Sequence, residues 1–334
     1  YYGRRPDSAM VRASTGIPAR PFASLAGVLD SLAGAGLDFY TLADFEDADF
    51  QRVDSLTRGV VFIRAFAAAH PSLKVRNAHP MVDQLRARKS AAEIELLRRA
   101  AALSDEGHLA AMRLAAPGLH EYDLQAAAEY AFRRGGASRP AYGSIVGSGQ
   151  RGTQLHYMKD RGPLEAGDLV VIDAAGEYEG YAADITRTLP VSGKFTPDQR
   201  AIYQLVRDAQ DAAERNSQPG MKISTATDSA IAVRARGLAA LGLIESADAI
   251  FDPPWQADCA AVPASCRQAM LWMIHGISHG LGLAVHDPTQ FYTGDRLVRP
   301  GDVFTIEPGI YISTVSLDIL PDTPRNREFI ARVR

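Results

Sequence analysis

Two aspartates stand in one apolar stretch, 170–188, whose pattern is typical of a β-hairpin. If Glu177 to Gly180 form the turn, Asp173 and Asp184 face each other on adjacent antiparallel strands. Directly opposed like charges destabilise a sheet, and apolar neighbours indicate that the Asp173 strand is buried. We therefore expect the pair to need a metal ion, a basic partner or a shared proton.

Three of the eight histidines, His275, His279 and His286, lie close together further along the chain. The spacing of His275 and His279 matches a helical zinc pair, but the Glu of that motif is absent and nearby glycines argue against a continuous helix. We expect a helix over 267–273 that ends near Gly276. An extended segment should follow, whose glycines let the backbone approach a ligand or another strand.

Glu307 stands between Ile306 and Pro308 in a β-rich run. An acid at such a position is either surface-facing on an edge strand or a ligand. Taken alone, it is more typical of an edge strand, because Pro308 cannot donate to a central ladder. Combined with the opposed aspartates and a histidine in a glycine-rich segment, it indicates a metal site.

The donor set of this site is rich in oxygen and has one imidazole. Such a set suits Mn²⁺, with Co²⁺, Fe²⁺ or Zn²⁺ as alternatives, better than a thiolate-type structural zinc. Four other histidines are interpreted as hydrogen-bonded fillers: His70, His79, His108 and His120.

In these motifs the sequence resembles the pita-bread-fold metallopeptidases, specifically the aminopeptidase P and prolidase branch. The resemblance runs from about residue 90 to 312, and the matching segments are 155–157, 173–195, 275–287 and 307–312. It implies that Asp173 chelates one metal ion, that Asp184 bridges two, and that His279 and Glu307 bind the second. The residues to which it gives substrate-contacting, proton-handling or pocket-lining roles are His156, His275, His286 and Tyr311.

One part of the family pattern has no match. The family uses a fifth ligand, a bridging Glu on a strand near the C-terminus, and no such motif follows Glu307. Glu328 stands in what resembles the start of a helix, so we do not assign it this role. We expect the sequence to lack the tail that carries the closing strand.

A length of 334 residues allows two domains, and 46% hydrophobic residues is ordinary for a globular protein. A net charge of −3 gives no long-range attraction for nucleic acid or an anionic membrane. No apolar stretch is long enough to span a bilayer. Cys259 and Cys266 are the only cysteines. They form either a local disulfide, which would indicate an oxidising compartment, or two thiols.

Residues 1–86 are expected to form a partial α/β N-terminal domain, with a helix over 21–35 and strands over 59–66 and 72–77. Residues 87–334 are expected to form an α+β catalytic domain of the pita-bread type, with helix pairs around a curved antiparallel sheet. Capping patterns at Ser90 and Thr196 open two of its helices. The four helices are expected over about 90–115, 121–134, 196–215 and 224–241.

The resemblance implies a two-metal exopeptidase that releases the N-terminal residue from peptides with proline second. Alternatives are an Xaa-Pro dipeptidase (prolidase) or a non-catalytic peptide-binding module on the same fold. A methionine aminopeptidase is less favoured, because its usual form lacks a separate N-terminal domain. The expected partners are proline-containing peptides and copies of the same chain in a dimer or tetramer, with no nucleic acid and no membrane.

Overall fold

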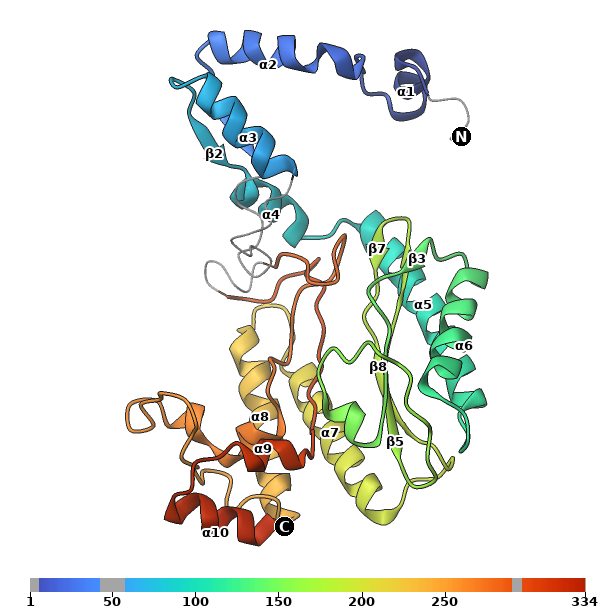
Figure 1. Cartoon of the computed structure of the whole chain (residues 1–334), viewed down its shortest axis with the longest axis vertical. Helices are drawn as coiled ribbons and strands as arrows, with labels where there is room; N and C mark the ends of the chain where they lie inside the picture. Colours follow the sequence, from blue (N-terminus) through green and yellow to red (C-terminus); the bar gives the residue numbers. More distant parts are fainter. Residues whose placement is uncertain (1–5, 43–57, 290–295, 334) are drawn as a thin grey trace. The chain divides into compact units, whose positions relative to one another are not determined.

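The computed structural model describes residues 6–42, 58–289 and 296–333. The chain divides into two units, Tyr1–Asp83 and Gln84–Arg334, and Figure 1 shows the elements of each. The assignment of 1–86 as a partial N-terminal domain and of 87–334 as the catalytic domain stays a prediction.

The first unit combines short helices with a two-stranded parallel sheet. Its elements are α1 (Ser8–Thr15), η1 (Phe22–Ser24), α2 (Leu25–Gly34), β1 (Phe39–Thr41), α3 (Arg58–Ala69) and β2 (Val75–Asn77), with α4 (His79–Ala87) following. A helix is confirmed within 21–35 and a strand within 72–77. The strand expected over 59–66 is wrong, because this segment lies in α3. Its buried side chains, Val60, Ile63 and Phe66, recur every third residue, which is the spacing of a helix face.

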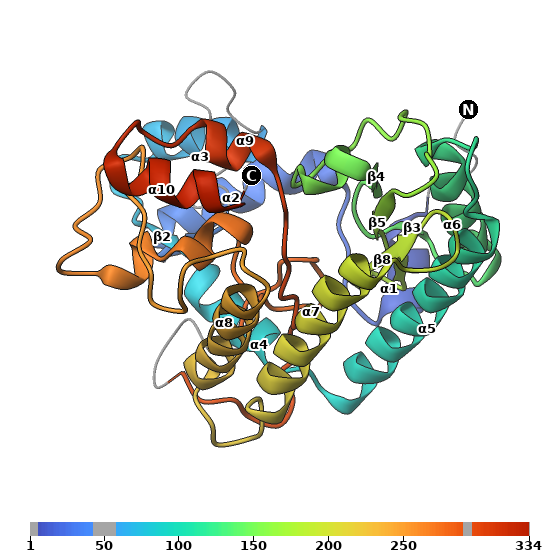
Figure 2. The same ribbon diagram turned by 90° about the horizontal axis from the view of Figure 1, so that it is seen from below.

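Four long helices of the second unit occupy the predicted segments. They are α5 (Ala91–Leu114), α6 (Glu121–Arg134), α7 (Pro197–Arg215) and α8 (Ile223–Ala240). Both predicted capping boxes are present: Ser90 accepts from the backbone of Glu93, and Thr196 from that of Gln199. Helix α5 packs on α6, and α7 on α8. Figure 2 shows these as two separate pairs.

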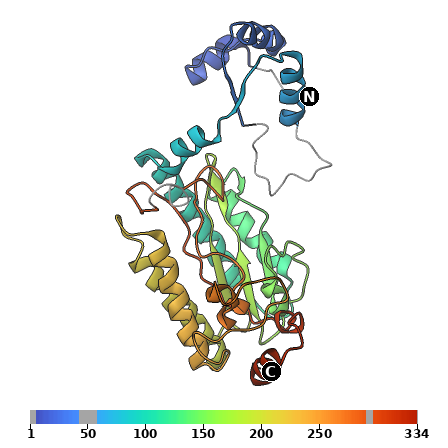
Figure 3. The ribbon, with the colours of Figure 1, turned by 90° about the vertical axis from the view of Figure 1, so that its left-hand side faces the viewer.

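The strands form two three-stranded antiparallel sheets, ordered β3-β6-β7 and β4-β5-β8. Their bounds are β3 (Arg139–Pro140), β4 (Ile145–Ser148), β5 (Leu169–Asp173), β6 (Gly176–Tyr178), β7 (Tyr181–Ala182) and β8 (Thr186–Pro190). Leu103 and Phe132 of α5 and α6 share a buried cluster with Val170 and Ile172 of β5. This apolar contact fixes β5 against the first helix pair, while α7 and α8 lie beside the strands (Figure 3).

The hairpin register predicted from the sequence is wrong by two residues. Tyr178 pairs with Tyr181, so the turn contains only Glu179 and Gly180, and Asp173 pairs with Thr186. Both turn residues have positive φ, 49° and 86°, as a tight hairpin turn requires. Because side chains alternate with period two, a two-residue shift leaves Asp184 on the predicted face. It lies in the break between β7 and β8 instead of directly opposite Asp173.

The C-terminal half contains extended segments joined by isolated bridges, among them Gly280 to Asp287 and Gly280 to Phe304. The helix expected over 267–273 is the short 3₁₀ helix η5 (Gln268–Trp272). It follows another 3₁₀ turn, η4 (Pro263–Cys266), and precedes α9 (Thr314–Asp318) and α10 (Pro324–Val333). Glu328 is exposed on α10, so the helix expected at that residue is confirmed.

The base of this half is a buried cluster that includes Phe251, Trp272 and Phe329. Cys259 and Cys266 form a disulfide with their Cα atoms 5.6 Å apart, a usual separation for such a bond. It closes a short loop immediately before η5. Among the helices that the structure describes, none has the length and apolarity needed to cross a membrane.

Replacing Thr196 with Ala should lower the free energy of unfolding by about 1 kcal/mol, because the first turn of α7 loses its side-chain acceptor. Chemical denaturation of the second unit measures the change. Thr196→Ser should retain most of the stability, and Lys194→Ala, an exposed neighbour, is the matched control. Equal stability of the Ala and Ser variants would contradict the capping role.

Candidate functional site

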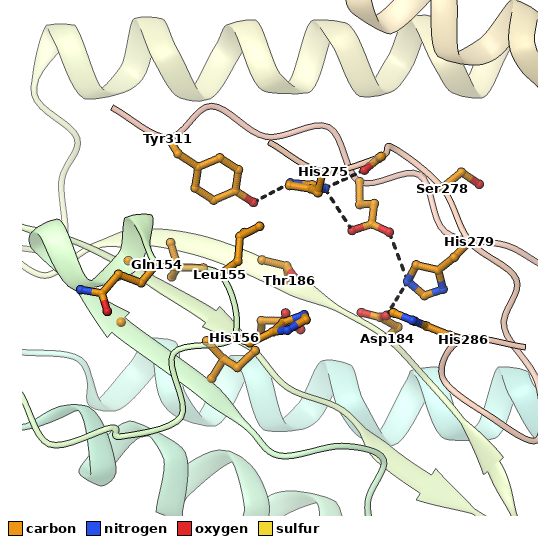
Figure 4. A pocket seen from close by; sticks show the side chains of 17 residues that line it. Gln154, Leu155, His156, Asp184, Thr186, His275, Ser278, His279, His286 and Tyr311 are labelled. Atoms are coloured by element: carbon orange, nitrogen blue, oxygen red, sulfur yellow. Dashed lines mark hydrogen bonds and ion pairs between the residues drawn. The ribbon is translucent and has the colours of Figure 1, made fainter. Parts of the chain in front are cut away.

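A pocket of about 350 Å³ lies within the second unit. All eight site residues predicted from the sequence line it: His156, Asp173, Asp184, His275, His279, His286, Glu307 and Tyr311. None of the four histidines interpreted as fillers does. Figure 4 shows that the labelled side chains come from two sides, His156, Asp184 and Thr186 from the strands and their loops, and His275, His279 and Tyr311 from the C-terminal segments.

Backbone pairing between two extended segments aligns His279 with Glu307. The N–H of Thr305 donates to His279 O at 2.9 Å, and the N–H of Glu307 donates to Ile277 O at 2.9 Å. The Thr305 hydroxyl donates to Glu307 Oε1 at 2.8 Å and also lies 3.0 Å from His279 N. Glu307 therefore points into the pocket, and the edge-strand interpretation of this acid is not needed.

Tyr142 joins the two aspartates. Its hydroxyl lies 2.6 Å from Asp173 Oδ1 and 3.3 Å from Asp184 Oδ1. Burial raises the pKa of Tyr142 well above its usual value, and the two carboxylate charges add to this effect. The hydroxyl thus stays protonated and donates to the nearer carboxylate. Sequence reasoning missed Tyr142, because a single tyrosine between Ala141 and Gly143 has no periodicity or spacing that relates it to the hairpin.

The carboxylates converge on His279. Its Nε2 lies 3.1 Å from both Asp184 Oδ2 and Glu307 Oε1. Burial alone would lower the pKa of His279, but hydrogen bonds to these two acids raise it to about 10. Burial raises the pKa of Asp173 to about 6, and the charge of Asp184 adds to this shift, which the Tyr142 hydrogen bond opposes. Burial alone would also raise the pKa of Glu307, but the hydrogen bond from His279 keeps this pKa below its usual value. The cluster therefore requires positive charge at its centre.

The donor atoms suit a divalent ion in chemistry and in spacing. Two ligands about 2.1 Å from one ion and at right angles to each other lie about 3 Å apart, which is the spacing from His279 Nε2 to each carboxylate oxygen. In the described part of the chain, no group of three or more acidic, histidine or cysteine side chains already has the arrangement of a closed metal site. The spacing of His279 Nε2 from Asp184 and Glu307 nevertheless suits one ion held between the three side chains. An ion at this position would bind neutral His279 and would supply the charge that the acids require.

His275 and Tyr311 form a second pair in the pocket. His275 Nε2 lies 2.8 Å from the Tyr311 hydroxyl, and its Nδ1 lies 2.6 Å from Gly276 O and 3.9 Å from Glu307 Oε2. Burial raises the pKa of Tyr311 to about 12, helped by the charges of Glu307 and Asp173. The Tyr311 hydroxyl therefore keeps its proton, and its contact with Nε2 holds the ring of His275 in place.

His286 and His156 contribute imidazoles from opposite sides. The His286 ring centre is 4.1 Å from that of His279. Burial lowers the pKa of His286, and the charge of His279 lowers it further. His156 is exposed on the loop after η3 (Gly149–Thr153) and has a φ of 54°. A non-glycine residue with positive φ is uncommon, and such conformations concentrate at functional sites.

Asp287, next to His286, has a buried side chain. Its role at the site was not predicted from the sequence. Its Oδ2 accepts from Lys89 Nζ at 2.9 Å, its Oδ1 is paired with Arg86, and both basic side chains precede α5. Asp287 Oδ1 also accepts from Ala284 N at 3.1 Å. This ion network holds the segment that carries His286 against the start of the second unit.

Sequence comparison relates the chain to known metallopeptidases. Residues 95–327 match the sequence model of metallopeptidase family M24. The Xaa-Pro aminopeptidase of Escherichia coli (strain K12) is 41% identical over 236 residues, which cover 70% of this chain and 51% of that protein. The Xaa-Pro dipeptidase of Homo sapiens is 34% identical over 281 residues, covering 77% and 54%. The chain thus spans about half the length of these curated relatives.

A solved structure gives the same result for the fold. Proline aminopeptidase P II from Yersinia pestis superposes with a TM-score of 0.76 at 34% identity, covering 97% of this chain and 71% of that one. This likeness confirms the α+β pita-bread fold predicted from the sequence. The match over 95–327, together with the fold, shows that the chain belongs to metallopeptidase family M24.

Proposed function

We propose that this chain carries the catalytic centre of an Xaa-Pro aminopeptidase, a metal-dependent exopeptidase that releases the N-terminal residue from peptides with proline second. The observation that carries this proposal is the gathering of three carboxylates and four histidines around one pocket. The higher identity to an Xaa-Pro aminopeptidase than to an Xaa-Pro dipeptidase, 41% against 34%, favours this activity over a prolidase.

The residues proposed to hold two divalent ions are Asp173, Asp184, His279 and Glu307. When bound, the ions would lower the pKa of a water molecule and polarise the scissile carbonyl. The oxygen-rich donor set favours Mn²⁺, with Co²⁺, Fe²⁺ or Zn²⁺ as alternatives. The Tyr142 hydroxyl would hold Asp173 in place by its hydrogen bond, and it also lies next to Asp184.

The other pocket residues would handle the substrate and its protons. Glu307 would accept a proton from the attacking water and transfer it to the leaving nitrogen. His275 and His286 would donate hydrogen bonds to the substrate carbonyls as negative charge develops on oxygen. Tyr311 would hold the ring of His275 in place, because its hydroxyl lies 2.8 Å from His275 Nε2. His156 would contact the substrate from the opposite side of the pocket. Assembly into a dimer or tetramer stays a prediction.

Asp184→Asn should reduce kcat/KM by at least about 100-fold, because it removes one of the carboxylate charges that would hold the two ions. A proline-peptide assay and metal analysis of the purified variant measure both effects. Glu179→Gln removes a charge from the exposed turn of the same hairpin and should leave both unchanged. Normal turnover by a folded Asp184→Asn protein that retains its metal would contradict the two-metal assignment.

His286→Ala should lower kcat on the order of 100-fold while metal content stays near that of the wild type, because the lost interaction forms mainly in the transition state. Steady-state kinetics beside metal analysis separates the two quantities. His70→Ala, which changes a histidine that pairs with Asp30 in the first unit, is the control. Parallel loss of metal and activity would instead make His286 a ligand or its support.

Comparison of an Xaa-Pro-Yaa tripeptide with the matching free Xaa-Pro dipeptide distinguishes the two candidate activities. We expect a higher kcat/KM for the tripeptide, as an aminopeptidase requires. A preference for the dipeptide would make the chain a prolidase. Binding of both peptides without hydrolysis of either, in the presence of Mn²⁺, would favour the peptide-binding module.

A further inference from the structure

Glu121, the first residue of α6, has a fully buried side chain outside the pocket lining. A buried carboxylate is costly unless charge and hydrogen bonds compensate for its lost hydration. Burial would raise the pKa of Glu121, but the hydrogen bonds from Arg151, two backbone N–H groups and Tyr157 outweigh it, and the pKa lies below its usual value. The carboxylate is therefore ionised at neutral pH.

Four donors reach Glu121, and they come from along a single loop. Oε1 accepts from Ser148 N at 2.8 Å and from Arg151 Nε at 2.6 Å. Oε2 accepts from the Tyr157 hydroxyl at 3.0 Å and from Gly162 N at 2.6 Å. Ser148 ends β4, Arg151 lies in the 3₁₀ turn η3, Tyr157 lies at the centre of the loop and Gly162 at its far end. One carboxylate ties the whole loop 149–162 to the start of α6.

Other contacts show how closely the loop is held. The N–H of Glu121 donates to Gly162 O at 2.9 Å, and Arg151 Nη2 donates to Pro163 O at 2.7 Å. A Cβ atom at residue 162 would lie 2.0 Å from Arg151 Nε, so a side chain there would displace the guanidinium from Glu121. Because Arg151 and Gly162 meet at Glu121, removal of its charge affects both ends of the loop.

His156 lies within this loop, next to Tyr157, and is exposed with a backbone φ of 54°. Its direction into the pocket therefore depends on how the loop backbone is fixed. We propose that Glu121 is a positioning residue that orders loop 149–162 and thereby aims His156 at the substrate. The effect on catalysis rests on the proposed peptidase function. The ordering of the loop by Glu121 is independent of that function.

The test compares Glu121→Gln with Glu177→Gln in the full chain. Glutamine has one acceptor oxygen in place of two, so at least two of the four donors lose their acceptor in Glu121→Gln. Glu177 is the matched control, because it is also a buried carboxylate and binds Arg139 at 2.8 and 2.6 Å, but it does not contact the loop. Amide hydrogen exchange over 149–162 should increase in Glu121→Gln alone. Unchanged exchange in the loop would overturn the proposal.

Kinetics provide the second measurement. We expect Glu121→Gln to lower kcat/KM for an Xaa-Pro-Yaa peptide on the order of 10- to 100-fold. In a His156→Ala background the same substitution should have less than about a twofold effect, because residues that act through one another are not additive. An equal loss in both backgrounds would mean that Glu121 does not act through His156.

The two measurements separate this proposal from the proposed function. If the wild-type chain loaded with Mn²⁺ hydrolyses no proline peptide, the peptidase function fails, and hydrogen exchange alone decides whether Glu121 orders the loop. If Glu121→Gln does not fold, Tyr157→Phe replaces it, since it removes one donor and leaves the carboxylate paired. Tyr157→Phe should raise exchange near 156 to a smaller extent, and no rise there would overturn the proposal.

Discussion

The candidate site depends on mutual repulsion among three carboxylates that are held close together and partly removed from water. Asp173, Asp184 and Glu307 lie around His279. The shifts in the pKa values of Asp173, His279 and Glu307 reflect both burial and neighbouring charge. Such a group of acids is stable only around a cation or a protonated partner. The surrounding structure must therefore hold the acids in place while a divalent ion, with its larger charge, is bound or exchanged.

The scaffold meets this requirement with two kinds of contact. Apolar packing of α5 and α6 on β5 fixes the strand that carries Asp173, and backbone pairing aligns the segments of His279 and Glu307. Buried polar groups hold the loops. Glu121 binds the loop of His156, and Asp287, paired with Lys89, holds the segment of His286. His156 and His286, which would contact a substrate, thus lie on loops that buried ion pairs hold in place.

This division suits a hydrolytic site. Metal ligands need fixed directions, because coordination distances tolerate little change. Strand β5 provides this for Asp173, and backbone pairing between extended segments provides it for His279 and Glu307. Groups that donate to a substrate need to reach into an open pocket, and loops allow this at the cost of order. Buried carboxylates with several donors restore that order, since each donor left without an acceptor would be destabilising. Glu121 and Asp287 therefore connect stability of the loops with the geometry of the pocket.

Local patterns in the sequence determined the four long helices of the second unit and the face of the hairpin, and the motifs that resemble a known family pointed to eight residues that line the pocket. The capping signals at Ser90 and Thr196 act within one turn, and the period-two alternation kept Asp173 and Asp184 on one face although the register differed by two residues. The sequence did not determine the secondary structure of segment 59–66, because a short apolar run is compatible with a strand or a helix until its packing partner is known.

Tertiary structure alone decided which distant polar groups meet. Tyr142 reaches Asp173, Glu121 reaches Tyr157, and Lys89 reaches Asp287 across gaps in sequence that no periodicity relates. The disulfide between Cys259 and Cys266 was likewise open from the sequence and is formed in the fold. The reason is physical: caps and alternation arise from neighbouring residues, whereas the pairing of a buried charge depends on the donors that the folded chain brings to it.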